Sequence, residues 1–296
     1  MEISAVVNRQ RASAKVAPAS EELALVIVWS ADQPHRVGEV ALLPTEHPRY
    51  FLGNPLSDNS PDAQRKDRGQ SLLFIRQRPA GVRDRDTLEL SLAALQQPMF
   101  PERQLELRPL KHAVFVKNLG SQPAFVNGIR LIEAPVVPGD TIYLQGRLVL
   151  YCTKRPTRMP PLSHYGADAA PFFGLPDDYG FVGESPAVWA ARDRMASGGP
   201  ASDEPPFSSR MEDLPLLINH MLRRCAQRDE FDLSRYFSDG LPRIHPQLIV
   251  QLLQRRDLLQ LADLPMVLMR ALANSSGDVI GPLPESAAAA AASMHV

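Results

Sequence analysis

The chain has 296 residues, which is enough for one large domain or two smaller ones. Hydrophobic residues make up 44% of it and charged residues 22%, a composition typical of soluble globular proteins. The formal net charge of −1 gives no general attraction to nucleic acids or anionic lipids. The apolar run at residues 23–29 is too short to span a bilayer, and we expect no secretory signal before it. These features predict a cytoplasmic protein without a membrane partner.

The first half of the chain reads as short strands. Residues 1–21 are polar, rich in Ala and Ser, and are predicted to be a disordered arm. Residues 22–156 then alternate apolar runs with turn signals, as the strands of an antiparallel sandwich do. The expected strands lie within residues 23–29, 35–43, 50–53, 72–79, 104–107, 114–116, 125–126, 141–144 and 148–151.

The clearest turn signals fall between residues 114 and 151. Asn127-Gly128 favours positive φ at both positions, which predicts a hairpin with a two-residue turn. Pro138-Gly139-Asp140 predicts another turn before the apolar strand at 141–144.

These same motifs resemble the C-terminal half of forkhead-associated (FHA) domains. Residues 118–121 (Asn-Leu-Gly-Ser), 125–128 (Phe-Val-Asn-Gly) and 138–140 (Pro-Gly-Asp) occur in the family's order and spacing. The resemblance implies a β-sandwich of the SMAD/FHA type over residues 22–156. The alternative is an unrelated β-sandwich that also uses Asn-Gly hairpins.

The family binds phosphothreonine with loop residues, and this sequence matches its pattern only in part. Asn54, after the matching Gly53, stands where the family has an arginine, and Pro101 stands where it has a serine. Because the missing arginine would supply a charged, bidentate partner, we expect weak or no affinity for phosphothreonine. Arg76, Arg78 and Arg103 are either substitute cations or, as we favour, a solvated face. The candidate partner-binding residues are Asn54, Arg103, Ser121, Gln122 and Asn127.

The second half of the chain is predicted to be helical. A Pro-rich linker is expected at 157–179, a helical region at 180–276 and a disordered tail at 277–296. Ser185 followed by Pro186 is a typical start of a helix, with the serine as its N-cap.

Three segments of this half resemble the AAA+ domain of sigma-54-dependent transcriptional activators. They are residues 182–186 (Val-Gly-Glu-Ser-Pro), 211–218, and 252–272, which can be aligned with the closing helix of that domain's lid. The resemblance implies a lid-like remnant without the nucleotide-binding core, because no GxxxxGK[ST] loop occurs in the chain. Ala262 also replaces the arginine that senses nucleotide. We therefore expect no nucleotide, no other cofactor, no metal and no direct DNA binding.

These features predict a non-catalytic signalling adaptor that binds a protein partner, either one containing phosphothreonine or a sigma-54 activator. The alternative is a regulator that acts in trans on sigma-54 activators through its lid-like helices. An enzyme has little support, because no nucleophile–base pair or carboxylate pair is visible in the sequence.

Overall fold

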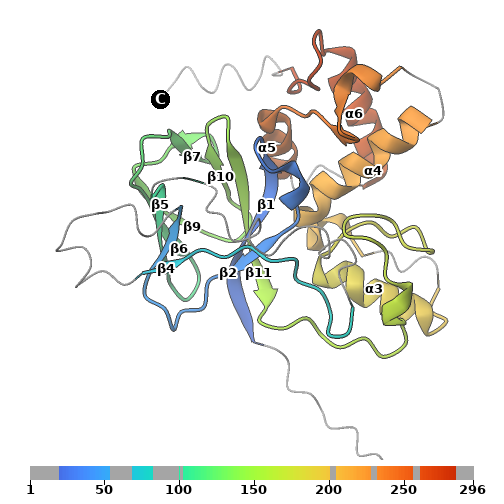
Figure 1. Ribbon diagram of the computed structural model, residues 1–296, viewed down its shortest axis with the longest axis horizontal. Coiled ribbons are helices and arrows are strands. Elements are labelled where there is room, and N and C mark those ends of the chain that lie inside the picture. The colour runs from blue at the N-terminus through green and yellow to red at the C-terminus, as the bar shows by residue number, and fades with distance from the viewer. Residues whose placement is uncertain are drawn as a thin grey trace, which may run out of the picture.

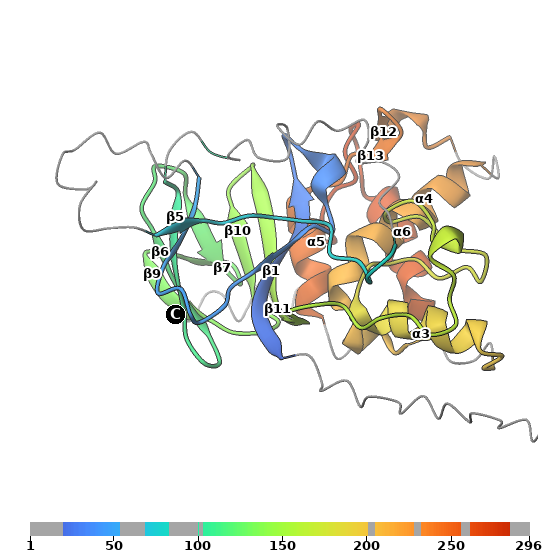
Figure 2. The ribbon, with the colours of Figure 1, turned by 60° about the horizontal axis from the view of Figure 1, so that its bottom comes forward.

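The computed structural model describes residues 20–53, 69–82, 100, 103–200, 205–227, 232–255 and 261–284. The first half of the chain forms two sheets, and the second half adds helices on one side of them (Figure 1). Seen from a second direction, one sheet, the other sheet and the helices follow one another as three layers (Figure 2). The predicted β-sandwich with a C-terminal helical region is therefore confirmed.

The first sheet has the strand order β2-β1-β11-β10-β7-β8, and the second has the order β4-β3-β5-β6-β9. The strands of the first sheet are β1 (Glu21–Ser30), β2 (Val40–Leu42), β7 (Ala124–Val126), β8 (Ile129–Arg130), β10 (Thr141–Leu144) and β11 (Leu148–Pro156). Those of the second sheet are β3 (Tyr50–Leu52), β4 (Gln70–Ser71), β5 (Leu105–Pro109), β6 (Val114–Asn118) and β9 (Glu133–Val136). All the described ladders are antiparallel except the one between β3 and β4.

Strand β1 is buried on both faces, which explains its continuous apolar run. Successive side chains of a strand point to opposite faces of the sheet. Leu25 and Ile27 accordingly pack in the core between the two sheets, whereas Val26 and Val28 pack against the helical half. The sandwich and the helices are thus built on the two faces of one strand.

The described part of the second half contains several helices. They are α3 (Pro186–Ala196), α4 (Leu214–Gln227), α5 (Pro246–Gln254) and α6 (Leu264–Ala273), and a small hairpin of β12 (Phe237–Ser238) and β13 (Leu241–Pro242) lies between α4 and α5. Of these helices, α4 and α5 lie against strands β1 and β11 of the first sheet. One face of α4 is buried, and it includes Leu217, Ile218 and Leu222. No helix in the described part of the chain is both long and apolar enough to cross a membrane.

The segment after β4 differs from its predicted strand at residues 72–79. The Leu72 N–H still donates to the Phe51 carbonyl of β3 at 2.8 Å, and Ile75 forms an isolated bridge to the main chain of Val40 through hydrogen bonds of 2.8 and 2.9 Å. The chain then leaves the sandwich, and the Gln77 side chain donates to the Pro156 carbonyl at 2.7 Å. The strand prediction is wrong here: Phe74 still packs in the core of the sandwich, but Arg76 and Arg78 turn toward the second half of the chain.

Two stretches predicted to lie outside the folded parts contain buried residues. Within the predicted linker at 157–179, Met159 and Tyr165 pack against Trp189 of α3. In the predicted tail, Ile280 and Leu283 are buried, and the His245 N–H donates to the Ile280 carbonyl at 2.9 Å. The packed part of the chain therefore continues to residue 284 instead of ending at 276, which corrects the predicted start of the tail.

Candidate functional site

The loop at residues 119–123 lies at one end of the sandwich, together with several other chain turns. The Gln145 N–H, just after β10, donates to the Pro123 carbonyl at 2.9 Å, and the Gln122 side chain donates to the Gln145 carbonyl. The Gln104 N–H, just before β5, donates to the Leu52 carbonyl at 2.8 Å. We call this end, with its loops at 119–123 and 145–147, the loop-119 end.

The side chain of Gln104 holds the loop at residues 119–123 through hydrogen bonds. Its Nε2 donates to Asn118 Oδ1 at 2.7 Å and to the Gln122 carbonyl at 2.9 Å. The Gln104 carbonyl accepts the N–H groups of Leu119 and Gly120 at 2.9 and 3.1 Å. Gln104 is buried, so these bonds are shielded from water and hold the loop in one conformation.

Gly120 is required by this close packing. A Cβ atom at position 120 would lie 2.2 Å from Gln104 Oε1, which no side chain can tolerate without displacing the amide. The sequence marked Gly120 as part of a family motif, and the structure supplies the physical reason for it.

Of the predicted partner-binding residues, Arg103, Ser121 and Gln122 lie at the loop-119 end. Ser121 is exposed, and Gln122 is partly buried by its bonds to the loops. The Arg103 guanidinium lies over the Phe51 ring, 4.4 Å from its centroid, as in a cation–π contact. Asn54, like the Pro101 position compared with the family's serine, falls outside the described residues.

Asn127 lies at the opposite end of the sandwich. It forms the hairpin turn between β7 and β8 with φ of 50°, followed by Gly128 with φ of 86°, so the predicted two-residue turn is confirmed. Its Oδ1 accepts the Thr141 N–H at 2.9 Å, and its Nδ2 donates to Asp140 Oδ1 at 2.8 Å. Thr141 begins β10, whereas Gln145 follows the end of that strand. The structure therefore gives Asn127 a role in joining two turns and separates it from the other predicted residues.

Two of the arginines considered as substitute cations, Arg76 and Arg78, do not form a solvated face. Arg78 is buried and binds both oxygens of Glu184, at 2.6 and 3.1 Å. Arg76 is 9% exposed and stacks on the Phe173 ring at 4.5 Å from its centroid. The favoured interpretation of Arg76 and Arg78 is therefore wrong, because both side chains pack against the second half of the chain.

Glu184, in the Val-Gly-Glu-Ser-Pro segment, is the centre of these contacts. Besides Arg78, its carboxylate accepts the Gly174 N–H at 2.9 Å and the Trp189 Nε1–H at 3.2 Å. Its carbonyl accepts Arg155 Nη1 at 3.0 Å, so β11 is joined as well. This role could not be predicted from the motif, because the motif gives no sign of a cationic partner 106 positions earlier.

A buried acidic pair lies beside this segment. Burial raises the pKa of Glu212, although the Arg155 guanidinium 3.0 Å away opposes this shift. Burial also raises the pKa of Asp213, against hydrogen bonds from Ser185 and from the Glu184 N–H. Ser185 is fully buried and its Oγ accepts the Val188 N–H at 3.3 Å, so the predicted helix cap is confirmed. The Ser185–Asp213 contact is closed to solvent and is structural.

The described residues include no group of three or more His, Cys, Asp or Glu side chains arranged to hold a metal ion. At the loop-119 end, the charged groups we find are instead arginines in contact with carboxylates or rings. Arg147 Nε, for example, lies 2.7 Å from Asp32 Oδ2. This arrangement suits recognition of a surface better than activation of a reacting group.

The sequence matches no family model. It also matches no curated protein. Among solved structures, the fold is similar to the FHA structure of Rv0020c, with a TM-score of 0.25, 16% identity, and coverage of 46% of this chain and 96% of that one. It is also similar to the FHA domain of a hypothetical protein from Arabidopsis thaliana, with a TM-score of 0.28, 13% identity, and coverage of 49% and 92%. Both neighbours are FHA domains, but at such TM-scores the likeness carries no argument about function. Neither neighbour bears on the resemblance to sigma-54 activators.

Proposed function

We propose that the chain is a non-catalytic adaptor that binds a protein partner through the loop-119 end of its sandwich. The observation that carries this proposal is the fixed loop at 119–123, in which Gln104 and Asn118 hold the main chain while Ser121 stays exposed. A loop already held in one conformation loses little conformational entropy when it binds. Loops positioned by a rigid scaffold are also where binding residues concentrate. The resemblance to sigma-54 activators suggests that the adaptor serves bacterial transcriptional signalling in the cytoplasm.

We expect phosphothreonine to contribute little to this binding. Asn54 stands where the family has its phosphate-binding arginine. Arg147 is paired with Asp32, and the Arg103 guanidinium lies over Phe51. A phosphate at this end would thus compete with existing contacts for its charge-assisted bonds. Arg103 is the described residue we expect to contribute most to any remaining affinity.

The alternative function, a regulator that acts in trans on sigma-54 activators through lid-like helices, has less support. The apolar faces of α4 and α5 are buried against β1 and β11 of the same chain. Because these apolar faces already pack against the sandwich of the same chain, they are not free to bind a sigma-54 activator. Co-purification with an intact activator and suppression of its ATPase activity would favour this alternative.

A site-specific crosslink tests the proposed docking end. A photoreactive benzoylphenylalanine is placed at Ser121 and, as the matched control, at Ile129, which is 76% exposed and follows the Asn127 turn at the other end. The full chain is irradiated in its own host. We expect a defined protein crosslinked from position 121 and not from position 129. Equal products from both positions, or none from 121, would contradict the proposal.

A peptide titration tests the phosphothreonine expectation separately. A phosphothreonine peptide library and its unphosphorylated counterpart are titrated against the full chain and the Arg103→Gln variant. We expect no phosphate-dependent dissociation constant below about 10 µM, the range in which specific recognition begins. Tighter phosphate-dependent binding that is lost in Arg103→Gln would show that the phosphate site is intact.

A further inference from the structure

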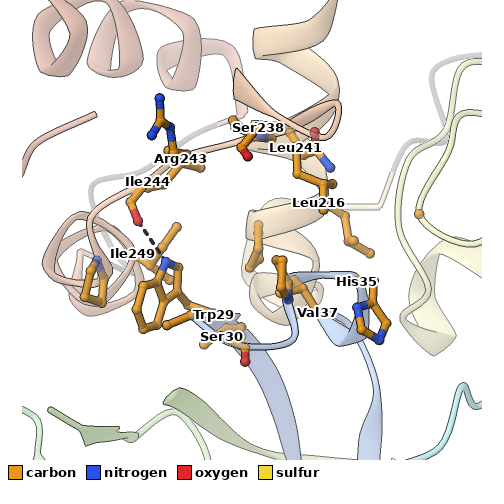
Figure 3. Close-up of a pocket in the computed structure, with 18 of the residues that line it drawn as sticks. Trp29, Ser30, His35, Val37, Leu216, Ser238, Leu241, Arg243, Ile244 and Ile249 are labelled. Carbon is orange, nitrogen blue, oxygen red and sulfur yellow. Dashed lines mark hydrogen bonds between the residues drawn. The ribbon is translucent and has the colours of Figure 1, made fainter. Parts of the chain in front are cut away.

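A cavity of about 780 Å³ lies where the sandwich meets the helical half. It is bordered by the end of β1, by α4, by the β12–β13 hairpin and by the start of α5, and we call it the junction pocket (Figure 3). The predicted linker also contributes, through residues 173–175. Pockets of 300 to 1,000 Å³ are typical of specific ligand sites, so this volume can hold a large side chain and its neighbours.

The floor of the junction pocket is apolar and its rim is polar. Trp29 and Ile249 lie on one side of the open space, Ser238 and Arg243 lie across it, and Leu216 lies at a third edge (Figure 3). Trp29 is held in place, because its Nε1–H donates to the Ile244 carbonyl at 2.8 Å. The pocket therefore has a rigid aromatic wall that can pack against a bulky apolar side chain.

The rim of the pocket contains a cation, Arg223, that pairs with no carboxylate in the described part of the chain. Arg223 lines the pocket from α4, and its Nε donates to the Gly240 carbonyl at 3.0 Å. Within the described ranges, no carboxylate pairs with it, whereas Arg243 is paired with Asp278 at 2.5 Å. Asp239 is an acidic residue of the same rim and takes a hydrogen bond from Ser238. An acidic side chain beside Arg223 would supply the missing partner.

Two polar atoms of the pocket lining have no hydrogen bond among the described residues. They are the buried Oδ1 of Asn219, an acceptor, and Nε of Arg243, a donor. Both atoms are closed to solvent, so a ligand in the pocket meets other lining atoms and does not bond to these two. A short peptide segment is favoured because it carries an apolar and an acidic side chain on one backbone, matching Trp29 and Arg223 in a cavity of about 780 Å³.

We propose that the junction pocket binds a short segment of a protein partner, in which a bulky apolar residue enters beside Trp29 and a nearby acidic residue pairs with Arg223. The site goes beyond the docking end proposed above and does not require it. The two are adjacent, because Asp32 lines the pocket while its partner Arg147 belongs to the loop-119 end. One partner could therefore occupy both.

The test uses the full chain as bait for a display library of random ten-residue peptides. We expect the selected peptides to combine an acidic residue with a Trp, Phe or Leu within about three positions, the reach between neighbouring side chains of one short segment. A selected peptide is then titrated against four proteins: the wild type and the Arg223→Glu, Arg224→Glu and Ser238→Trp variants. Arg224 is the matched control, since it is the exposed neighbour of Arg223 on α4 and does not line the pocket.

Arg223→Glu is expected to weaken binding by about tenfold or more, as reversal of a paired charge does. Arg224→Glu should change it by less than about twofold, as expected for a charge outside the contact. Ser238→Trp, at an exposed position of the rim, should block the pocket and abolish binding. The proposal is overturned if no peptide is selected, or if selected peptides bind Arg223→Glu and Ser238→Trp as they bind the wild type. A Ser121→Trp variant separates the two sites, because it changes only the loop-119 end and should leave this binding intact.

Discussion

Arg78 and Glu184, which are 106 positions apart in the sequence, form a buried, bidentate ion pair. Their side chains are only 4% and 2% exposed. Arg78 follows the sandwich strand β4, and Glu184 precedes helix α3, so the pair joins the two halves of the protein. Two buried charges are costly to remove from water, and each stays stable only while the other is present.

Glu184→Gln is therefore expected to destabilise the whole protein. The glutamine keeps the shape of the side chain but leaves the Arg78 guanidinium without its counter-charge. Removing one partner of a buried pair costs roughly 3–5 kcal/mol. Urea unfolding followed by circular dichroism measures this loss.

The control for Glu184→Gln is the same substitution at Glu133, whose ion pair with Lys117 is exposed and 3.8 Å long. Exposed pairs contribute about 0–1 kcal/mol, so Glu133→Gln should scarcely change the unfolding free energy. Equal effects of the two substitutions would show that Glu184 does not hold the halves together.

Much of the fold could be predicted because its signals are local. The Asn127-Gly128 turn follows from the φ values those residues favour, and the start of α3 follows from Ser185 and Pro186. Alternation and turn spacing likewise placed most strands of the sandwich. These features depend on neighbours within a few residues, which a single sequence displays directly.

The contacts between the halves could not be predicted in this way. Residues 72–79 look like a strand because nothing in the sequence shows what else their apolar side chains would contact. In the structure, Arg76 and Arg78 from that segment instead reach Phe173 and Glu184. The prediction of the candidate site was wrong for Asn127 for the same reason. Asn127 belongs to a family motif, but the pairing of β7 with β10 places it at the end of the sandwich opposite to Gln122. Such placements depend on long-range pairing, which no local pattern reveals.

Gly120→Ala should loosen the loop-119 end. The added methyl group would displace the Gln104 amide, whose Oε1 lies 2.2 Å from the Cβ position, and break its bonds to the loop. We expect a loss of about 1–3 kcal/mol, as for other overpacked sites. Gly166→Ala is the control, since a Cβ there would meet no atom within 4 Å.

Combining Gly120→Ala with Gln104→Ala gives a second check on this contact. If the methyl group acts through the Gln104 amide, the double variant loses less stability than the sum of the two single variants. Strict additivity would mean that the two positions act independently. Amide hydrogen exchange of residues 119–123 reports the loosening directly.

Asp193 should make the stability of the protein depend on pH in the acidic range. Partial burial tends to raise its pKa, but the N–H groups of His164, Tyr165 and Ser163 bind its Oδ1 and bring the pKa below the usual value of 3.8. A carboxyl group whose pKa is lower in the folded state binds protons more readily when unfolded. Its contribution is therefore complete above pH 3.8 and is lost as the pH falls through the lower folded value.

Asp193→Asn keeps an oxygen acceptor but no charge, and it isolates this effect. The wild type should be more stable than Asp193→Asn by about 1 kcal/mol at neutral pH, as for a charge-assisted bond replaced by a neutral one. The difference in unfolding free energy should stay constant from pH 5 down to about 3.8 and shrink as the pH is lowered further toward 3. A difference that stays constant all the way to this lower pH would contradict the assignment.

Asn127 is expected to act on stability and not on partner binding. Asn127→Gly keeps the φ of 50° without strain but removes the bonds to Thr141 and Asp140, one of which satisfies a buried main-chain N–H. This should cost about 1–3 kcal/mol. Asn127→Ala should cost roughly 1 kcal/mol more, because alanine tolerates a left-handed conformation poorly. Since position 127 lies at the end of the sandwich opposite to Ser121, neither variant should alter the crosslink from position 121 at temperatures where the protein is folded. Loss of that crosslink in a folded Asn127→Gly protein would instead show that Asn127 contributes to partner binding.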